Sequence, residues 1–123
     1  MNIPKIFESE YRFCCILWDN EPVTSSELVK LCAEKLGWKK STTYTVIKRL
    51  SERGVLKTEN TIVTALVSRE QVQEQESREF VDRTFHGSLP QFLAAFTRHQ
   101  NLSREEVAQI QSLIDNYREE EKP

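Results

Sequence analysis

The sequence predicts a mainly α-helical protein with one small β-hairpin, divided into an N-terminal part of residues 1–67 and a C-terminal helical part of residues 68–123. Apolar residues recur at intervals of three and four along most of the chain, which is the period of a helix. Two short runs rich in β-branched residues flank a polar turn near the middle of the chain, which is typical of a hairpin. Each of the three glycines follows a predicted helix, where glycine commonly ends one.

The first helix is predicted from Glu8 to Asp19, before the turn Asn20-Glu21-Pro22. Its apolar positions are expected to form one buried stripe of Phe7, Tyr11, Cys14, Cys15 and Trp18. The cysteines of this stripe, like Cys32, have two interpretations: core packing, which the usual burial of free cysteine favours, or a thiol sensor or metal site. Nothing near them supplies further metal ligands at short spacing, so we expect neither a metal nor a cofactor.

A second helix is predicted from the capping pair Thr24 and Glu27 through about Leu36, where Gly37 stops it. Val23, just before this helix, is expected to pair as a short strand. The helix assignment rests on local chemistry, because a Thr hydroxyl three residues before a Glu can accept a free N–H group at a helix start.

The third helix begins near Lys39 and ends near Gly54. Apolar side chains at Val46, Ile47 and Leu50 share one stripe with Thr43, at spacings of three and four, so this face is expected to be buried. The remaining side chains face outward and are hydroxyls, one phenol and cations: Ser41, Thr42, Tyr44, Thr45, Lys48 and Arg49.

Residues 55–58 and 62–66 then read VLKT and IVTAL around the polar turn Glu59-Asn60-Thr61, which predicts a hairpin. Three helices followed by such a hairpin make a winged helix-turn-helix. Its third helix would be the recognition helix, because small hydrogen-bonding groups surrounded by positive charge suit the DNA major groove.

Two kinds of DNA contact are expected from this helix. The hydroxyls of Ser41, Thr42 and Thr45 can pair with base edges, and Tyr44 can stack on a thymine methyl or bind a phosphate. Four cations are expected to contact phosphates without reading sequence, namely Lys39, Lys40, Lys48 and Arg49. The alternative is a solvated helix face, in which Arg49 pairs with Glu52 or with an acid of the first helix.

Charge is distributed unevenly along the chain, whose net charge is −2. Residues 1–58 hold 10 Lys and Arg against 7 Asp and Glu, whereas residues 59–123 hold 7 against 12. Between residues 35 and 57 seven cations accompany the single acid Glu52. Binding to phosphates needs local positive charge rather than a basic protein, so this distribution favours DNA binding by the third helix.

The C-terminal part is predicted to be three helices: one from the capping pair Ser68 and Gln71 to Phe85, a short one around residues 89–96, and one opened by Ser103 and Glu106. Their apolar stripes are too sparse to form a core in so small a unit, so a second copy of the chain is expected to cover them. The predicted dimerisation residues are Phe80, Phe85, Leu89, Phe92, Leu93, Phe96, Val107, Ile110, Leu113, Ile114 and Tyr117.

Several classes of function are excluded by the same sequence. His86 and His99 are solitary, and no pattern of nucleophile, base and glycine-rich loop is present, so the protein is not expected to be an enzyme. No secretory signal and no apolar run long enough to cross a bilayer are found, so we expect a cytoplasmic protein without membrane insertion. The competing class is a winged-helix module for protein–protein assembly, but its third helix would expose apolar anchors rather than Ser, Thr and Lys.

Three segments together resemble a known family: STTYTVIKRLSERGVLK at residues 41–57, Leu17-Trp18 in the first helix, and FLAAF at residues 92–96. They are similar to the penicillinase-repressor family, the BlaI/MecI/CopY group of bacterial transcriptional repressors, from about Phe7 to Tyr117. The resemblance implies a homodimer joined through C-terminal helices. Its two winged domains would bind an inverted-repeat operator and block transcription of an adjacent resistance or homeostasis gene.

The resemblance also carries over to particular positions. The family's base-contacting positions correspond to Ser41, Thr42, Tyr44 and Thr45. Family wings commonly carry a basic or aromatic tip; here the tip is acidic and polar, so Lys57 at the base of the wing is the better candidate for a DNA contact.

Two control mechanisms of the family make different demands on the C-terminal part. Copper-responsive members carry a Cys-x-Cys pair there, and no cysteine follows Cys32, so that mechanism is excluded. Antibiotic-responsive members are cut before a Phe that corresponds to Phe96, by a membrane sensor acting as a metalloprotease. The bond would be Ala95–Phe96, although Asn is expected before the cut. The alternative is that Phe96 packs in the dimer.

Overall fold

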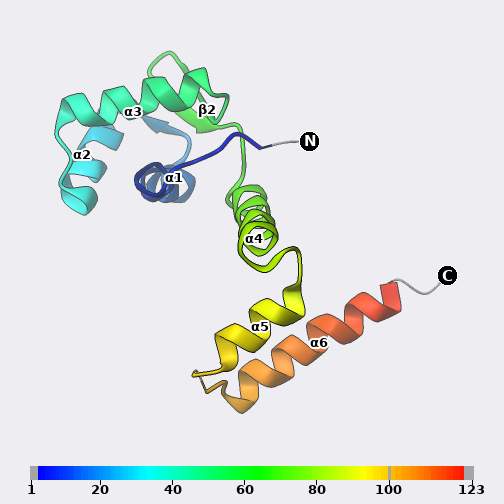
Figure 1. Ribbon diagram of the computed structural model, residues 1–123. Coiled ribbons are helices and arrows are strands. Elements are labelled where there is room, and N and C mark those ends of the chain that lie inside the picture. The colour runs from blue at the N-terminus through cyan, green and yellow to red at the C-terminus, as the bar shows by residue number, and fades with distance from the viewer. Residues whose placement is uncertain (1–2, 100, 121–123) are drawn as a thin grey trace. The chain divides into compact units, whose positions relative to one another are not determined.

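The computed structural model describes residues 3–99 and 101–120, in two compact units of residues 1–79 and 80–123. The elements of the chain, coloured in order in Figure 1, are α1 (Glu8–Asn20), β1 (Val23–Thr24), α2 (Ser25–Leu36), α3 (Lys40–Glu52), β2 (Leu56–Glu59), β3 (Ile62–Ala65), α4 (Arg69–Phe85), α5 (Leu89–Thr97) and α6 (Arg104–Glu120). The predicted fold class, mainly α with one β-hairpin, is therefore confirmed, and the predicted helix bounds are correct to within one or two residues.

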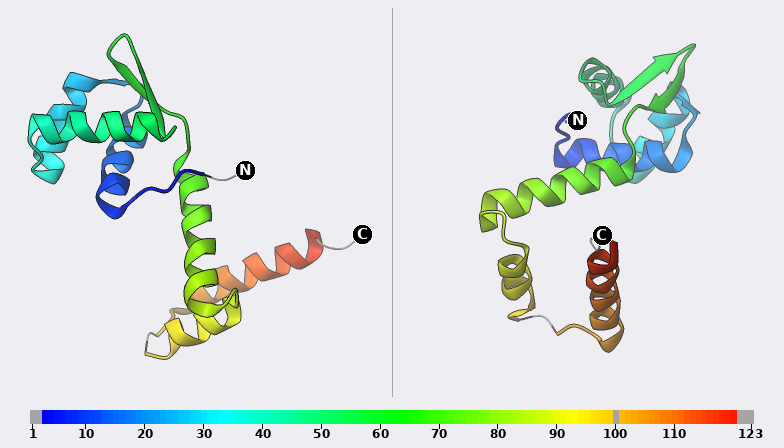
Figure 2. Two further views of the ribbon diagram at one scale, coloured as in Figure 1. Left: turned by 45° about the horizontal axis from the view of Figure 1, so that its top comes forward. Right: turned by 90° about the vertical axis from the view of Figure 1, so that its right-hand side faces the viewer.

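The three strands form one antiparallel sheet in the order β1-β3-β2. Val23 pairs with Val63, which confirms the predicted short strand, and Leu56 pairs with Ala65. Glu59 pairs with Ile62, so Glu59 belongs to β2 and not to the turn as predicted. We call the β2–β3 hairpin the wing; Figure 2 shows its loop standing clear of the helices of the first unit.

The loop of the wing contains only Asn60 and Thr61, and both have a positive φ, of 51° and 66°. This is the conformation of a type I′ turn, which matches the twist of two antiparallel strands. Threonine is disfavoured there because its branched Cβ crowds the backbone. We expect Thr61→Gly to raise the free energy of unfolding by up to about 1 kcal/mol. Urea denaturation measures this, and an unchanged or lower midpoint would contradict the turn assignment.

Helix caps follow the predicted chemistry. The Thr24 hydroxyl accepts the Glu27 N–H at 3.2 Å. At the start of α4, Ser68 and Gln71 each accept the other's backbone N–H through a side-chain oxygen, and Ser103 and Glu106 do the same at the start of α6. Gly37 ends α2 with a φ of 68°, a conformation that glycine adopts without strain.

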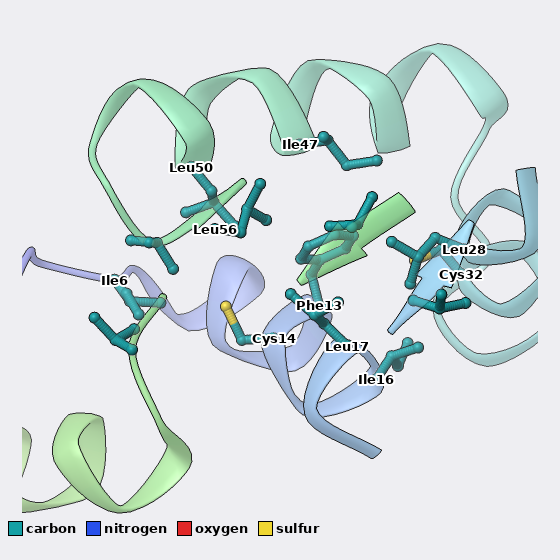
Figure 3. Close-up of a cluster of buried hydrophobic side chains, with 14 of the residues drawn as sticks. Ile6, Phe13, Cys14, Ile16, Leu17, Leu28, Cys32, Ile47, Leu50 and Leu56 are labelled. Atoms are coloured by element: carbon teal, nitrogen blue, oxygen red, sulfur yellow. The ribbon is translucent and has the colours of Figure 1, made fainter. Parts of the chain in front are cut away.

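The core of the first unit lies between α1, α2, α3 and the sheet. Figure 3 shows Phe13 of α1 beneath α3, with Ile47 and Leu50 directed toward it. The fully buried side chains come from α1, α2, α3, β2, β3 and the residue before β2: Phe13, Cys14, Leu17, Leu28, Cys32, Thr43, Leu50, Val55, Leu56 and Val63. Burial of this apolar area, at about 25 cal/mol per Å², is the main stabilising contribution to the unit.

The predicted buried stripe of α1 is wrong in part. Phe7 precedes the helix and is 56% exposed, whereas Phe13, Ile16 and Leu17, which the prediction left out, are buried. The reason is that α1 packs on two sides. Its Phe13 face meets α2, α3 and the sheet, while Trp18 donates its indole N–H to the Val67 carbonyl at 3.0 Å, beside the start of α4.

The first half of α4 packs on the N-terminal unit. Val72 is buried in its core, and the Gln75 side chain exchanges hydrogen bonds with the backbone N–H and carbonyl of Ile3. Arg69 donates to Asp19 at 2.7 Å. The division between the compact units thus falls inside α4, and the predicted functional division between residues 67 and 68 stays a prediction.

The second unit has little core of its own. Phe80, Phe85, Phe92 and Phe96 form a chain of aromatic contacts with centroid distances of 5.5–5.9 Å. No described residue of α6 is buried, and Leu113 is 70% exposed. The apolar edge of α6 therefore lies in solvent in the single chain.

Candidate nucleic-acid interface

The exposed face of α3 is the candidate interface. Thr43, Ile47 and Leu50 of the predicted stripe are buried and anchor the helix to the core, and Val46 is half-buried against it. Every predicted DNA-contacting residue is exposed: Lys39, Lys40, Ser41, Thr42, Tyr44, Thr45, Lys48, Arg49 and Lys57. Their exposure leaves them free to bind a ligand, while their role in DNA contact stays a prediction.

The hydroxyls of α3 are not equivalent. Thr45 donates its proton to the Ser41 carbonyl one turn earlier at 2.9 Å, so its oxygen is left mainly as an acceptor. The hydroxyls of Ser41 and Thr42 have no hydrogen-bond partner among the described residues, so they keep both donor and acceptor capacity. Ser41 and Thr42 therefore have more free hydrogen-bonding capacity than Thr45.

The cations of α3 are largely uncompensated. In the part of the chain that the structure describes, no salt bridge involves Lys39, Lys40, Lys48 or Arg49. Among these described residues no salt bridge joins Arg49 to Glu52 or to an acid of α1, although the charge of Arg49 contributes to the lowered pKa of Glu10. Lys57 lies 3.5 Å from Glu59, but both side chains are exposed, and such pairs are weak. The positive field around α3 thus persists in the folded protein.

Two residues that position α3 escaped the sequence interpretation. Arg53, at the C-terminal end of α3, binds the carboxylate of Glu10 on α1 through both of its terminal nitrogens. This hydrogen bonding holds the pKa of Glu10 below, and that of Arg53 above, its ordinary value. The available signal was a charged residue at position 10, three and four residues before the buried Phe13 and Cys14.

Cys14 and Cys32 pack in the core. Burial raises the pKa of the Cys14 thiol to about 12 and also raises that of Cys32, so neither is a reactive thiolate at neutral pH. Cys15 is half-buried. No group of three or more His, Cys, Asp or Glu residues that could hold a metal occurs in residues 3–99 and 101–120.

None of the described helices is long and apolar enough to span a membrane.

The remaining predicted residues lie in the second unit. Ala95 and Phe96 are in the last turns of α5, with Ala95 half-buried and Phe96 exposed. Of the predicted dimerisation residues, Phe85, Phe92, Leu93 and Ile110 are half-buried, while the others are exposed: Phe80, Leu89, Phe96, Val107, Leu113, Ile114 and Tyr117. This unit therefore presents a broad apolar surface.

Three helices, a three-stranded sheet with a projecting wing, and a third helix that exposes hydroxyls and cations define a winged helix-turn-helix protein of the DNA-binding class. The family model described as "Penicillinase repressor" matches residues 6–116. The chain belongs to this family, whose members are transcriptional repressors rather than enzymes.

Individual relatives agree with this assignment. The penicillinase repressor of Bacillus licheniformis is 22% identical over 98% of this chain and 97% of its own length. The methicillin resistance regulatory protein MecI of Staphylococcus aureus (strain Mu50) is 21% identical over 90% and 94%. An uncharacterized 16.5 kDa protein of Latilactobacillus sakei is 31% identical over 92% of this chain and 80% of its own.

A solved structure of the Bacillus licheniformis repressor BlaI, in its monomeric form with the blaP half-operator, is similar with a TM-score of 0.50 and 22% identity. The match covers 56% of this chain and 89% of that one. The similarity supports the winged-helix fold of the first unit.

Proposed function

We propose that this protein is a homodimeric transcriptional repressor that binds an inverted-repeat operator through α3 of each subunit. The observation that carries the proposal is the exposed face of α3, where partner-free hydroxyls at Ser41 and Thr42 stand among cations without salt bridges. Hydroxyls at this position can read base edges, and the cations can bind phosphates. The BlaI relative was solved on a half-operator, which supports the same use of the fold here.

Dimer formation is the second part of the proposal. The apolar edge of α6 contains Val107, Ile110, Ile114 and Tyr117 at alternating spacings of three and four, and most of it is exposed in the single chain. That spacing forms a continuous seam which a second helix can cover. A twofold dimer would place its two recognition helices in successive major grooves, about 34 Å apart.

Relief of repression is proposed to follow cleavage of the Ala95–Phe96 bond by a membrane sensor metalloprotease. Support comes from the family and from the exposure of Phe96. The bond lies within α5, where a peptide bond is not accessible to a protease until the helix unwinds locally. Cleavage would disconnect the chain segment that contains Phe80, Phe85 and Phe92 from the segment that contains α6. Loss of this connection would weaken the dimer.

The proposed site of action is the cytoplasm, because a repressor of this kind acts on the chromosome. The regulated gene is proposed to be an adjacent gene for resistance or homeostasis, in keeping with the names of the relatives.

Thr42→Ala tests the proposal directly. We expect it to weaken binding to a duplex selected by the wild-type protein from a random library by about 1–3 kcal/mol, since one base contact is lost. Binding to random DNA should be unchanged. Fluorescence anisotropy with both duplexes measures the two affinities.

Lys48→Ala is the matched comparison on the same helix. It should weaken binding to both duplexes and reduce the salt dependence of log Kd by about one unit, as expected for a phosphate contact. Equal losses on both duplexes for Thr42→Ala would refute its base contact. Binding that ignores salt would favour a protein–protein module instead.

A further inference from the structure

Glu10 is the one strongly buried carboxylate of the described residues, with 7% of its surface exposed. A buried charge is costly unless it is paired and hydrogen-bonded. Here the Phe7 N–H donates to Oε1 at 2.9 Å, and Arg53 donates to Oε1 and Oε2 at 2.8 Å each. The carboxylate is therefore satisfied only while the C-terminal end of α3 stays at the N-terminal end of α1.

Arg53 is held from several sides. It also donates to the Lys5 carbonyl, and its guanidinium lies over the Phe7 ring, 5.5 Å from the centroid. A planar guanidinium in a two-nitrogen contact with a carboxylate fixes direction as well as distance, which a lysine ammonium does not. This end of α3 is thus fixed in orientation, not merely attracted to α1.

The other end of α3 is also held by α1. Trp38 comes just before the N-cap Lys39, and its ring stacks on that of Phe13 with a centroid distance of 6.0 Å and an interplanar angle of 3°. Phe13 is fully buried under α3, as Figure 3 shows. Glu10 and Phe13 are three residues apart and so share one face of α1. Two fixed points, one near each end, define the axis of α3.

The orientation of this axis matters for one kind of DNA contact only. A hydrogen bond from Thr42 to a base edge requires donor and acceptor within about 3.2 Å and nearly aligned. Contacts from Lys39 or Lys48 to phosphates tolerate a small rotation of α3. Their side chains are long and flexible, and attraction between charges depends little on direction. A small rotation of α3 would lower specific affinity and spare random binding.

We infer that Glu10 and Arg53 are positioning residues for sequence-specific DNA binding, acting by holding α3 at the angle its base contacts need. This inference rests on the proposed function. It differs from a direct role of Arg53, in which the guanidinium would bind a phosphate itself. The two roles predict opposite effects of Glu10→Gln: under the positioning role DNA binding weakens, whereas a phosphate-binding Arg53 would be released and DNA binding would strengthen.

The test uses the full-length chain, a duplex selected by the wild-type protein from a random library, and a duplex of unrelated sequence. Arg53→Lys keeps the charge but loses the two-nitrogen contact, and Glu10→Gln keeps an acceptor for Phe7 but loses the charge. We expect either variant to bind the selected duplex about tenfold more weakly, while affinity for the unrelated duplex changes less than about twofold.

The matched control is the Glu8–Arg12 pair on α1, which is joined at 3.2 Å but exposed. Glu8→Gln and Arg12→Lys should leave both affinities unchanged. Circular dichroism at the assay temperature establishes that each variant is folded, and a purely structural role would lower its melting temperature without changing the ratio of the two affinities. Should Glu10→Gln not fold, Arg53→Lys decides alone.

The outcomes are distinguishable. A wild-type protein that binds neither duplex removes the proposed function and this inference with it. A wild-type protein that prefers its selected duplex, with Arg53→Lys and Glu10→Gln retaining that preference, overturns the inference alone. Stronger binding by Glu10→Gln would also overturn it and assign Arg53 to phosphate contact.

Discussion

Ile114→Asp should convert the protein from a dimer to a monomer and lower its affinity for the full inverted-repeat duplex by about 10²–10⁴-fold. The physical reason is that the second half-site is bound as an intramolecular event only while the subunits are joined. Ile114 lies near the middle of the exposed apolar edge of α6, where a carboxylate in the covered seam would lose its hydration. Sedimentation velocity measures the mass, and anisotropy measures the affinity.

Ser112→Asp is the matched control for this prediction. It introduces the same side chain two residues earlier in α6, on the side away from Val107, Ile110 and Ile114. We expect it to remain dimeric and to bind as the wild type does. Binding of Ile114→Asp to a single half-site should also be unchanged. A dimeric Ile114→Asp variant would show that α6 is not the dimer contact.

Leu50→Ala should lower the free energy of unfolding by about 2–5 kcal/mol, the range for removing a buried leucine side chain and leaving a cavity. Leu50 is 0% exposed and joins α3 to the core beneath it. Small domains have only about 5–15 kcal/mol of stability in total, so this loss is a large fraction of it. Urea denaturation followed by circular dichroism measures the change.

Leu66→Ala removes the same atoms from a residue that is 52% exposed just after β3. Its expected cost is below about 1 kcal/mol, because less apolar area is returned to water and no enclosed cavity forms. Similar costs for the two variants would contradict the burial of Leu50 and, with it, the assignment of the inward face of α3.

The features of this fold that could be predicted from the sequence are those encoded locally. The start of α2 follows from Thr24, whose hydroxyl accepts the Glu27 N–H, and the start of α6 from the capping box of Ser103 and Glu106, because both caps join residues three apart. The inward face of α3 follows from Thr43, Ile47 and Leu50, because spacings of four and three keep side chains on one face of a helix. The exposed face, and hence the candidate interface, is what remains after that stripe is assigned.

The errors occurred where apolar residues surround a helix. In α1 the stripe of Tyr11 and Trp18 and the stripe of Phe13 and Leu17 are both apolar, and period alone does not say which one meets the core. The structure uses both, one against the central core and one beside the start of α4. Which surface is covered depends on the partners and not on the helix itself.

By itself the sequence determined the order of elements, the N-terminal caps of α2, α4 and α6, and the hydroxyl and cation face of α3, because each depends on residues within one or two turns of a helix. Only the tertiary structure decided how α3 and α4 are held: Glu10 and Arg53, which join α1 to the end of α3, are 43 positions apart, and Ile3 and Gln75, which join the N-terminal segment to α4, are 72 apart. Such contacts form only when separate elements pack together. A buried carboxylate such as Glu10 is stabilised by a cation that lies beside it only in the folded chain.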